Sequence, residues 1–172
     1  ENKQLCHALN FKNSRLYAAG LIACQVIGRQ TSPWFTVVEI NKGSDHGVKQ
    51  GKAVIEAKGL VGKVIEVRPL TSLVMLLIDP QFKAAALCSR SRDAGIVAGQ
   101  ANNILKMKYV GAASSILIGD QIITSQISSF APAGLPIGRV HKAVKNNQDL
   151  FFDIEIEPAV NFLNLEYLFV VN

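Results

Sequence analysis

The feature that most constrains this chain is a run of short Val- and Ile-rich segments that begins at Leu21 and continues to the C-terminus. Glycines or Asn-Asp clusters interrupt the run every eight to twelve residues or so, a spacing typical of all-β folds. About a dozen such strands leave no room for crossover helices, so a sandwich or a barrel is expected. The residues are 49% hydrophobic and only 18% charged, which suffices for packed cores and excludes a disordered chain.

One turn sequence occurs twice in the chain. The segment GLVGKV at residues 59–64 returns as GLPIGRV at residues 134–140, and a glycine-led strand precedes each, starting at Gly51 and at Gly119. Each glycine is expected where a strand bends sharply and a side chain would obstruct the bend. The repeat predicts two small six-stranded β-barrels in tandem, the first over residues 21–97 and the second over residues 98–172.

The first twenty residues have a different pattern. Leu5, Leu9 and Leu16 lie at core positions of a heptad repeat, so residues 1–20 are predicted to be the C-terminal end of a coiled-coil helix through which the chain self-associates. A terminal helix packed on its own domain is the alternative. The sequence starts at Glu1, and we expect a membrane anchor upstream of it; no apolar run within the chain reaches the length of a membrane span.

The cysteines and histidines of the sequence give little support for a catalytic or metal-binding site. Three cysteines, Cys6, Cys24 and Cys88, show no CxxC spacing and are expected to be small buried hydrophobes. The histidines are isolated from other potential ligands, so we predict no metal and no cofactor.

A serine protease is the enzymatic alternative, because paired barrels also build that class. His46, Asp79 and Ser125 occur in the chain order of chymotrypsin. However, no serine lies in a Gly-Asp-Ser-Gly setting that could frame an oxyanion hole, so we predict that the chain is not an enzyme.

A net charge of +5 suggests a module that binds nucleic acid or another anionic polymer. The segment Lys106–Tyr109 is the best candidate for such a site. Strand alternation would place its two lysines on one face and Tyr109 on the other, whereas stacking sites need cation and aromatic together. We therefore predict that nucleic acid is not a partner.

Seven motifs, in order along the chain, closely resemble the MreC family of bacterial rod-shape-determining proteins over Val26–Val171. They are PWFTVVEINKGSDHGVKQG (33–51), GLVGKV (59–64), IDP (78–80), RSRDAGI (90–96), GDQIITS (119–125), GLPIGRV (134–140) and EIEPAVNFLNLEYLFVV (155–171).

The resemblance implies a non-enzymatic periplasmic scaffold of the cell-elongation machinery, anchored to the inner membrane. It implies a coiled-coil helix and two β-barrels that self-associate and bind a class B penicillin-binding protein involved in peptidoglycan synthesis. MreD and the actin-like MreB, reached through the N-terminal part, are further implied partners.

A partner surface is expected on the second barrel. In the segment 150–157, Leu150, Phe152, Ile154 and Ile156 alternate onto an apolar face, so Phe151 points outward among carboxylates. Tyr167 and Phe169 make the last strand apolar on both sides, as if another molecule covers one of them. Phe151, Tyr167 and Phe169 are the predicted partner-binding residues; ordinary surface exposure, or cover by the first barrel, is the alternative.

Overall fold

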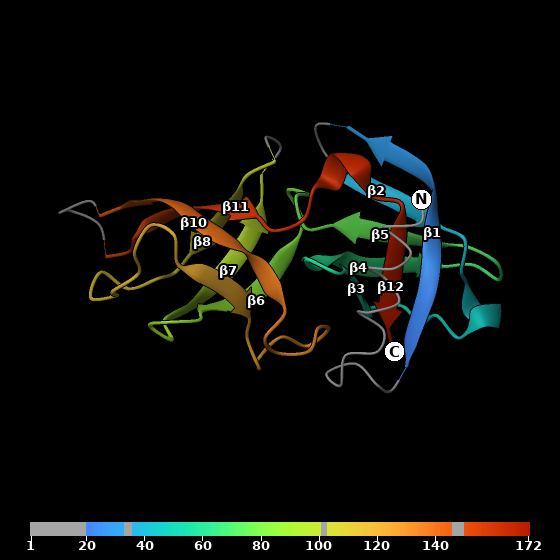
Figure 1. Ribbon diagram of the computed structural model, residues 1–172, viewed down its shortest axis with the longest axis horizontal. Helices are drawn as coiled ribbons and strands as arrows, with labels where there is room; N and C mark the ends of the chain where they lie inside the picture. Colours follow the sequence, from blue (N-terminus) through green and yellow to red (C-terminus); the bar gives the residue numbers. More distant parts are fainter. Residues whose placement is uncertain (1–19, 33–35, 101–102, 146–149) are drawn as a thin grey trace.

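The computed structural model describes residues 20–32, 36–100, 103–145 and 150–172. Their strands form two closed antiparallel barrels that lie side by side along the long axis of the molecule (Figure 1). The predicted pair of six-stranded barrels is therefore confirmed. The predicted N-terminal helix, with Leu5, Leu9 and Leu16, lies outside the described residues except for Gly20.

The first barrel has the strand order β1-β12-β3-β4-β5-β2. Its strands are β1 (Leu21–Thr31), β2 (Thr36–Ile40), β3 (Ala53–Glu56), β4 (Gly59–Val67), β5 (Ser72–Leu76) and β12 (Tyr167–Val171). A short 3-10 helix, η2 (Ser44–His46), follows β2. The early strands thus form five sixths of a barrel, and the last strand of the chain closes it by pairing with β1 and β3.

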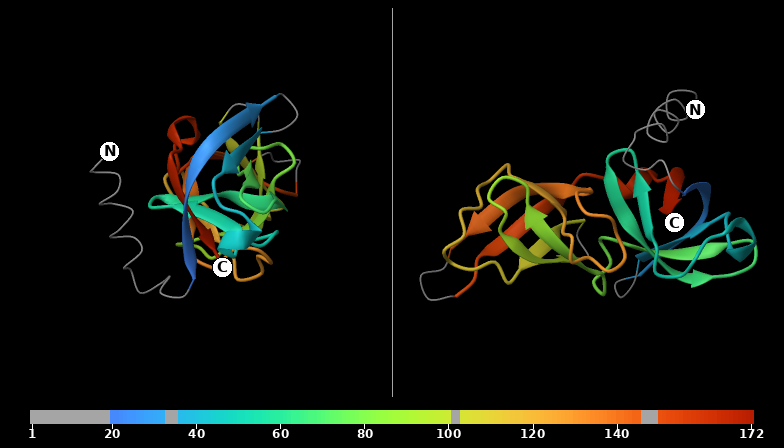
Figure 2. Two further views of the ribbon diagram at one scale, coloured as in Figure 1. Left: turned by 90° about the vertical axis from the view of Figure 1, so that its right-hand side faces the viewer. Right: turned by 90° about the horizontal axis from the view of Figure 1, so that it is seen from below.

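The second barrel has the order β10-β11-β8-β7-β6-β9. Its strands are β6 (Lys83–Cys88), β7 (Ala94–Gly99), β8 (Leu105–Lys108), β9 (Gln121–Thr124), β10 (Pro136–Val144) and β11 (Asp153–Pro158). The 3-10 helix η3 (Phe162–Asn164) lies on the way from β11 back to β12. The second barrel is therefore inserted between the fifth and sixth strands of the first (Figure 2).

This insertion corrects the predicted boundary between residues 97 and 98. β6 and the larger part of β7, assigned to the first barrel from sequence, belong to the second, and β12 belongs to the first. The physical reason is edge closure: without β12, β1 and β3 would each expose a row of unpaired backbone groups. The apolar character of β12 on both faces fits a strand built into a barrel, with Leu168, Phe169 and Val170 all buried.

The repeated turn has the same hydrogen bonds in both barrels. The Gly51 N–H donates to the Val64 carbonyl at 2.8 Å, and the Val64 N–H donates to the Lys52 carbonyl at 2.9 Å. In the second barrel the Gly119 N–H donates to the Val140 carbonyl at 2.8 Å, and the Val140 N–H donates to the Asp120 carbonyl at 2.9 Å. The repeat predicted from sequence is therefore a structural repeat.

The second glycine of each corner is required by a close backbone approach. A Cβ added to Gly62 would lie 2.1 Å from the Met75 carbonyl oxygen, and one added to Gly138 would lie 2.1 Å from the Glu157 carbonyl oxygen. Neither space admits a methyl group. The two corners also meet each other, because a Cβ on Gly59 would lie 2.2 Å from the carbonyl oxygen of Pro136.

The barrel junction is packed by the segment between β5 and β6. The buried Asp79 carboxylate accepts hydrogen bonds from the backbone N–H of Thr36 and of Gln81. Phe82, also buried, packs edge-to-face on Phe130 with ring centroids 5.7 Å apart. Lys63 of the first barrel places its Nζ 5.5 Å from the centroid of Phe130, so the loop after β9 contacts both barrels.

Candidate partner-binding surface and inter-barrel cleft

An apolar groove lies on the second barrel where the chain leaves β8 and where it enters β11. Both segments are at the end of this barrel that points away from the first barrel (Figure 1). Its volume is about 530 Å³. The groove is lined by Lys106, Met107, Lys108, Tyr109, Leu150, Phe151, Phe152 and Asp153. We call the exposed part of it, Tyr109, Leu150 and Phe151, the distal surface; these side chains are 63%, 80% and 48% exposed.

Phe151 is held in place on the distal surface by an aromatic partner and by the backbone. Its ring packs edge-to-face on Tyr109, with centroids 6.0 Å apart and planes at 84°. Phe151 also forms an antiparallel bridge with Gly111, and the next residue, Phe152, donates its N–H to the Val110 carbonyl. The prediction that Phe151 is exposed is confirmed. Its contacts are with Tyr109 and Gly111, which follow β8 in the chain.

Tyr109 does not lie on the face that strand alternation predicts for it. β8 ends at Lys108, and Tyr109 has a φ of +64°, so strand alternation stops one residue before it. The left-handed backbone turns the ring toward Phe151, and Tyr109 lines the same groove as Lys106 and Lys108. A positive φ at a bulky residue is uncommon and often marks a functional position.

The rim of the groove is basic but partly neutralised. Lys106 is 3.5 Å from an Asp153 carboxylate oxygen. Lys145 places its Nζ 5.6 Å from the ring centroid of Phe152. The groove therefore combines aromatic and aliphatic anchors with charged edges, which is the composition of a protein interface with an apolar centre and a polar rim.

Two carboxylates fix the loop that runs from Tyr109 to Asp120 across this end of the barrel. Asp120 accepts hydrogen bonds from Arg90 at 2.8 and 2.7 Å and from the Leu117 N–H at 2.9 Å. The Arg90 bonds are the main cause that lowers the pKa of Asp120 to about 2. Asp93 accepts from the Ser114 hydroxyl at 2.7 Å, and that bond chiefly lowers its pKa. The loop is thus held at its middle, by Asp93, and at its C-terminal end, by Asp120.

The other predicted partner-binding residues do not join Phe151. Tyr167 and Phe169 lie on β12 in the first barrel, and Phe169 is buried against the barrel beside its pair Ile55. Placing them on the second barrel was therefore wrong, because β12 closes the first. Leu150 was expected on the inner face; β11 starts only at Asp153, so Leu150 precedes the alternating strand and is exposed.

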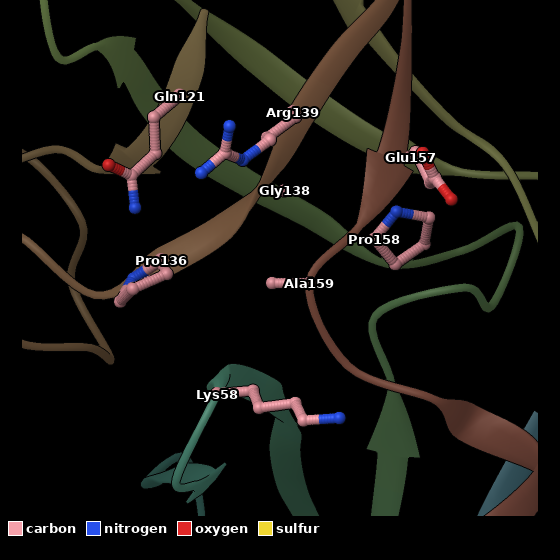
Figure 3. Close-up of a pocket in the computed structure, with 8 residues that line it drawn as sticks. All are labelled: Lys58, Gln121, Pro136, Gly138, Arg139, Glu157, Pro158 and Ala159. Atoms are coloured by element: carbon pink, nitrogen blue, oxygen red, sulfur yellow. The ribbon is translucent and has the colours of Figure 1, made fainter. Parts of the chain in front are cut away.

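A second hollow, of about 350 Å³, lies where the two barrels meet (Figure 3). Lys58, in the β3–β4 turn, lines it from the first barrel. Gln121, Pro136, Gly138, Arg139, Glu157, Pro158 and Ala159 line it from the second barrel and the segment that follows. Gln121 and Glu157 pair with Arg139 from the two neighbouring strands, so the three polar side chains form a row across the sheet. We call this hollow the inter-barrel cleft.

The three residues of the serine-protease alternative do not assemble. His46 Nδ1 accepts from the Gly43 N–H at 3.3 Å, and the Ser125 hydroxyl accepts from the Ile127 N–H at 3.3 Å. Asp79 is occupied by two backbone N–H groups at the junction. Each of the three side chains thus accepts hydrogen bonds from backbone N–H groups, and none of these bonds joins one of the three residues to another.

Among the described residues, the potential metal ligands are dispersed and the cysteines form no disulfide. No group of three or more His, Cys, Asp or Glu side chains gathers there. Cys24 and Cys88 are free and buried, as expected, and burial raises the pKa of the Cys24 thiol to about 12. Cys6 lies outside the described residues. None of the described helices could span a membrane.

The fold and these two surfaces define a class: a double-barrel module in which one barrel is inserted into the other. The family model for the barrel core of the rod shape-determining protein MreC matches residues 26–172. The chain belongs to the MreC family.

Individual relatives agree. The cell shape-determining protein MreC of Escherichia coli is 32% identical over 86% of this chain and 40% of its own length. A solved MreC structure, 28% identical, superimposes with a TM-score of 0.92 over 99% of this chain and 97% of that one. A complex between penicillin-binding protein PBP2 and MreC from Helicobacter pylori gives a TM-score of 0.67 at 12% identity, over 89% of this chain and 99% of the matched chain. This last likeness shows the fold alone. This chain spans less than half of the Escherichia coli protein.

Proposed function

We propose that this chain is a non-enzymatic periplasmic scaffold of the bacterial cell-elongation machinery. In this proposal it controls rod shape by binding a class B penicillin-binding protein involved in peptidoglycan synthesis. Membership in the MreC family supports the role, and the Helicobacter pylori MreC, which is in complex with PBP2, supports the partner.

The observation that carries the proposal is the distal surface. Large apolar side chains with more than half of their area exposed are common one at a time, but here Tyr109 and Leu150 flank Phe151 in a single groove. The Tyr109–Phe151 contact and the hydrogen-bonded loop 109–120 hold these apolar side chains in place before binding, which lowers the entropy cost of association. Aromatic residues are enriched at protein interfaces, and a few buried anchors there carry most of the binding energy.

The experiment is Phe151→Ala, measured for affinity to the membrane-proximal domain of the penicillin-binding protein and for melting temperature. Truncation of an interface anchor costs about 2 kcal/mol, or roughly a 30-fold rise in Kd. Folding stability falls by only about 1 kcal/mol, because the ring is half exposed and loses one aromatic contact.

Leu70→Ala is the matched control. Leu70 is a similarly exposed apolar side chain in the β4–β5 turn of the first barrel, so its loss should leave the Kd unchanged. A Phe151→Ala protein with reduced stability but unchanged affinity would show that Phe151 serves the fold and would refute the assignment.

The remaining parts of the role concern segments outside the described residues. We propose that Leu5, Leu9 and Leu16 lie on a coiled-coil helix through which the chain self-associates as a dimer or higher oligomer. An anchor in the inner membrane upstream of Glu1, and contacts with MreD and MreB through that N-terminal part, complete the proposal.

A further inference from the structure

The structural repeat begins before the corner glycines, in the turn that leads into each of them. Val48 lies three residues before Gly51 and is 3% exposed, and Ile116 lies three residues before Gly119 and is 4% exposed. Both glycines have a positive φ, +81° and +91°. Each barrel thus has the same turn, in which a buried aliphatic residue is followed by two exposed residues and a glycine with left-handed backbone.

The two exposed residues of this turn differ in polarity between the barrels. In the first barrel they are Lys49 and Gln50, and the Gln50 Nε2 donates to the Ile65 carbonyl at 2.7 Å. In the second barrel they are Leu117 and Ile118, which are 61% and 69% exposed. Exposed turn positions usually carry polar residues, and the first barrel shows that this turn forms with them. The fold therefore does not require Leu117 and Ile118 to be apolar. We call these two residues the apolar turn.

Hydrogen bonds fix the backbone of the apolar turn. The Asp120 N–H donates to the Leu117 carbonyl at 3.2 Å, and the Leu117 N–H donates to the Asp120 carboxylate at 2.9 Å. Arg90 donates to the same carboxylate at 2.8 and 2.7 Å. Two adjacent aliphatic side chains are thus presented to solvent by a fixed backbone, which lowers the entropy cost of burying them against a partner.

The apolar turn lies on the loop that leaves the distal surface at Tyr109. Within this loop, Gly111 forms a bridge with Phe151, and the Ala112 N–H donates to the Leu150 carbonyl at 3.0 Å. Figure 1 shows the loop, in yellow, at the end of the second barrel that points away from the first. The distal surface and the apolar turn are therefore parts of one hydrogen-bonded segment at one end of the molecule.

We propose that Leu117 and Ile118 form a second apolar contact for the partner that binds the distal surface. The class B penicillin-binding protein then covers the loop from Tyr109 to the apolar turn, and this inference rests on the proposed function. It requires of the partner an apolar depression beside the site that receives Phe151. Aliphatic side chains are less frequent than aromatic ones among the residues that dominate interfaces, so the pair together should contribute less than Phe151.

The test is the double variant Leu117→Gln/Ile118→Gln, measured for affinity to the membrane-proximal domain of the penicillin-binding protein. Gln50 shows that glutamine is compatible with the turn, so the melting temperature should stay within about 3 °C of the unaltered protein. The Kd should rise about tenfold, chiefly through faster dissociation. Leu70→Gln is the matched control, because Leu70 is 64% exposed on the first barrel, and its affinity should be unchanged.

Phe151→Ala, measured in parallel, separates this inference from the proposed function. Weaker binding by Phe151→Ala with unchanged binding by the double variant would overturn the second contact and leave the distal surface in place. Unchanged affinity in both would overturn both. Unchanged affinity together with a lower sedimentation coefficient in the double variant would assign the apolar turn to contacts between copies of this chain, against the proposal. An equal loss of affinity in Leu70→Gln would reduce the effect to general surface hydrophobicity and overturn it as well.

Discussion

Substitution of Leu168 by alanine should destabilise the first barrel although the residue lies only four positions before the last residue of the sequence. Leu168 is fully buried on β12, opposite Cys24 of β1. Because β12 lies between β1 and β3 in the barrel, a cavity there weakens the closure of the whole first barrel. If the barrels were instead divided between residues 97 and 98, Leu168→Ala would destabilise the second barrel.

The expected size follows from the side chain that is lost. Truncation of a fully buried leucine costs 2 to 5 kcal/mol, and about 3 kcal/mol is a fair central value where strands on both sides limit relaxation. Domain stabilities are about 5 to 15 kcal/mol, so the barrel should still fold. A loss of about 3 kcal/mol raises the population of the opened barrel roughly 150-fold.

Hydrogen exchange read at individual amides measures that population barrel by barrel. Leu168→Ala should reduce protection chiefly in β1 to β5, whereas Ile154→Ala, at an equally buried site on β11, should reduce it chiefly in β6 to β10. Loss of protection in the second barrel with the first unchanged in Leu168→Ala would refute the exchanged strand.

Two further predictions concern the corner and the anchored loop. Gly138→Ala should lower the free energy of unfolding, measured by urea denaturation, by about 3 kcal/mol, because the added Cβ meets the Glu157 carbonyl. Gly134→Ala should lower it by only about 1 kcal/mol, because Gly134 has a φ of +85° but open space around its Cβ position. Equal losses in the two variants would contradict the steric argument. Asp120 has a lowered pKa, so its contribution to stability is present above its ordinary value of 3.8 and is lost as the pH falls toward 2. Asp120→Asn should therefore be less stable than the unaltered protein at pH 7, with the gap closing toward pH 2; a gap independent of pH would show that the Arg90 contact does not stabilise the ionised form.

Much of the fold could be predicted from local patterns. Strand length, glycine corners and the repeat of GLVGKV in GLPIGRV are properties of a few neighbouring residues, and they predicted two barrels correctly. The assignment of β12 could not be reached in this way, because its pairing joins residues that are about 145 positions apart in the case of β1 and about 115 in the case of β3, and such pairing leaves no local mark. Its apolar character on both faces was the available signal, and it indicated burial in a barrel rather than a partner surface.

The distal surface was only partly predictable for a similar reason. Alternation placed Phe151 outside correctly, but alternation holds only within a strand. Tyr109 and Leu150 lie just beyond the ends of β8 and β11, where a positive φ and a hairpin change the direction of the side chain. No pattern in the sequence marks those two ends, so the aromatic pair that organises the groove emerges only in three dimensions.

The most direct test of the account is to locate the penicillin-binding protein on this chain by site-specific photo-crosslinking. A photoreactive phenylalanine analogue placed singly at Tyr109, Phe151, Leu70 and Ile127 samples the distal surface and two apolar positions elsewhere that are at least as exposed. The account predicts crosslinks to the membrane-proximal domain of the penicillin-binding protein from positions 109 and 151, and none from positions 70 and 127. Crosslinks from position 70 or 127, with none from 109 and 151, would contradict it.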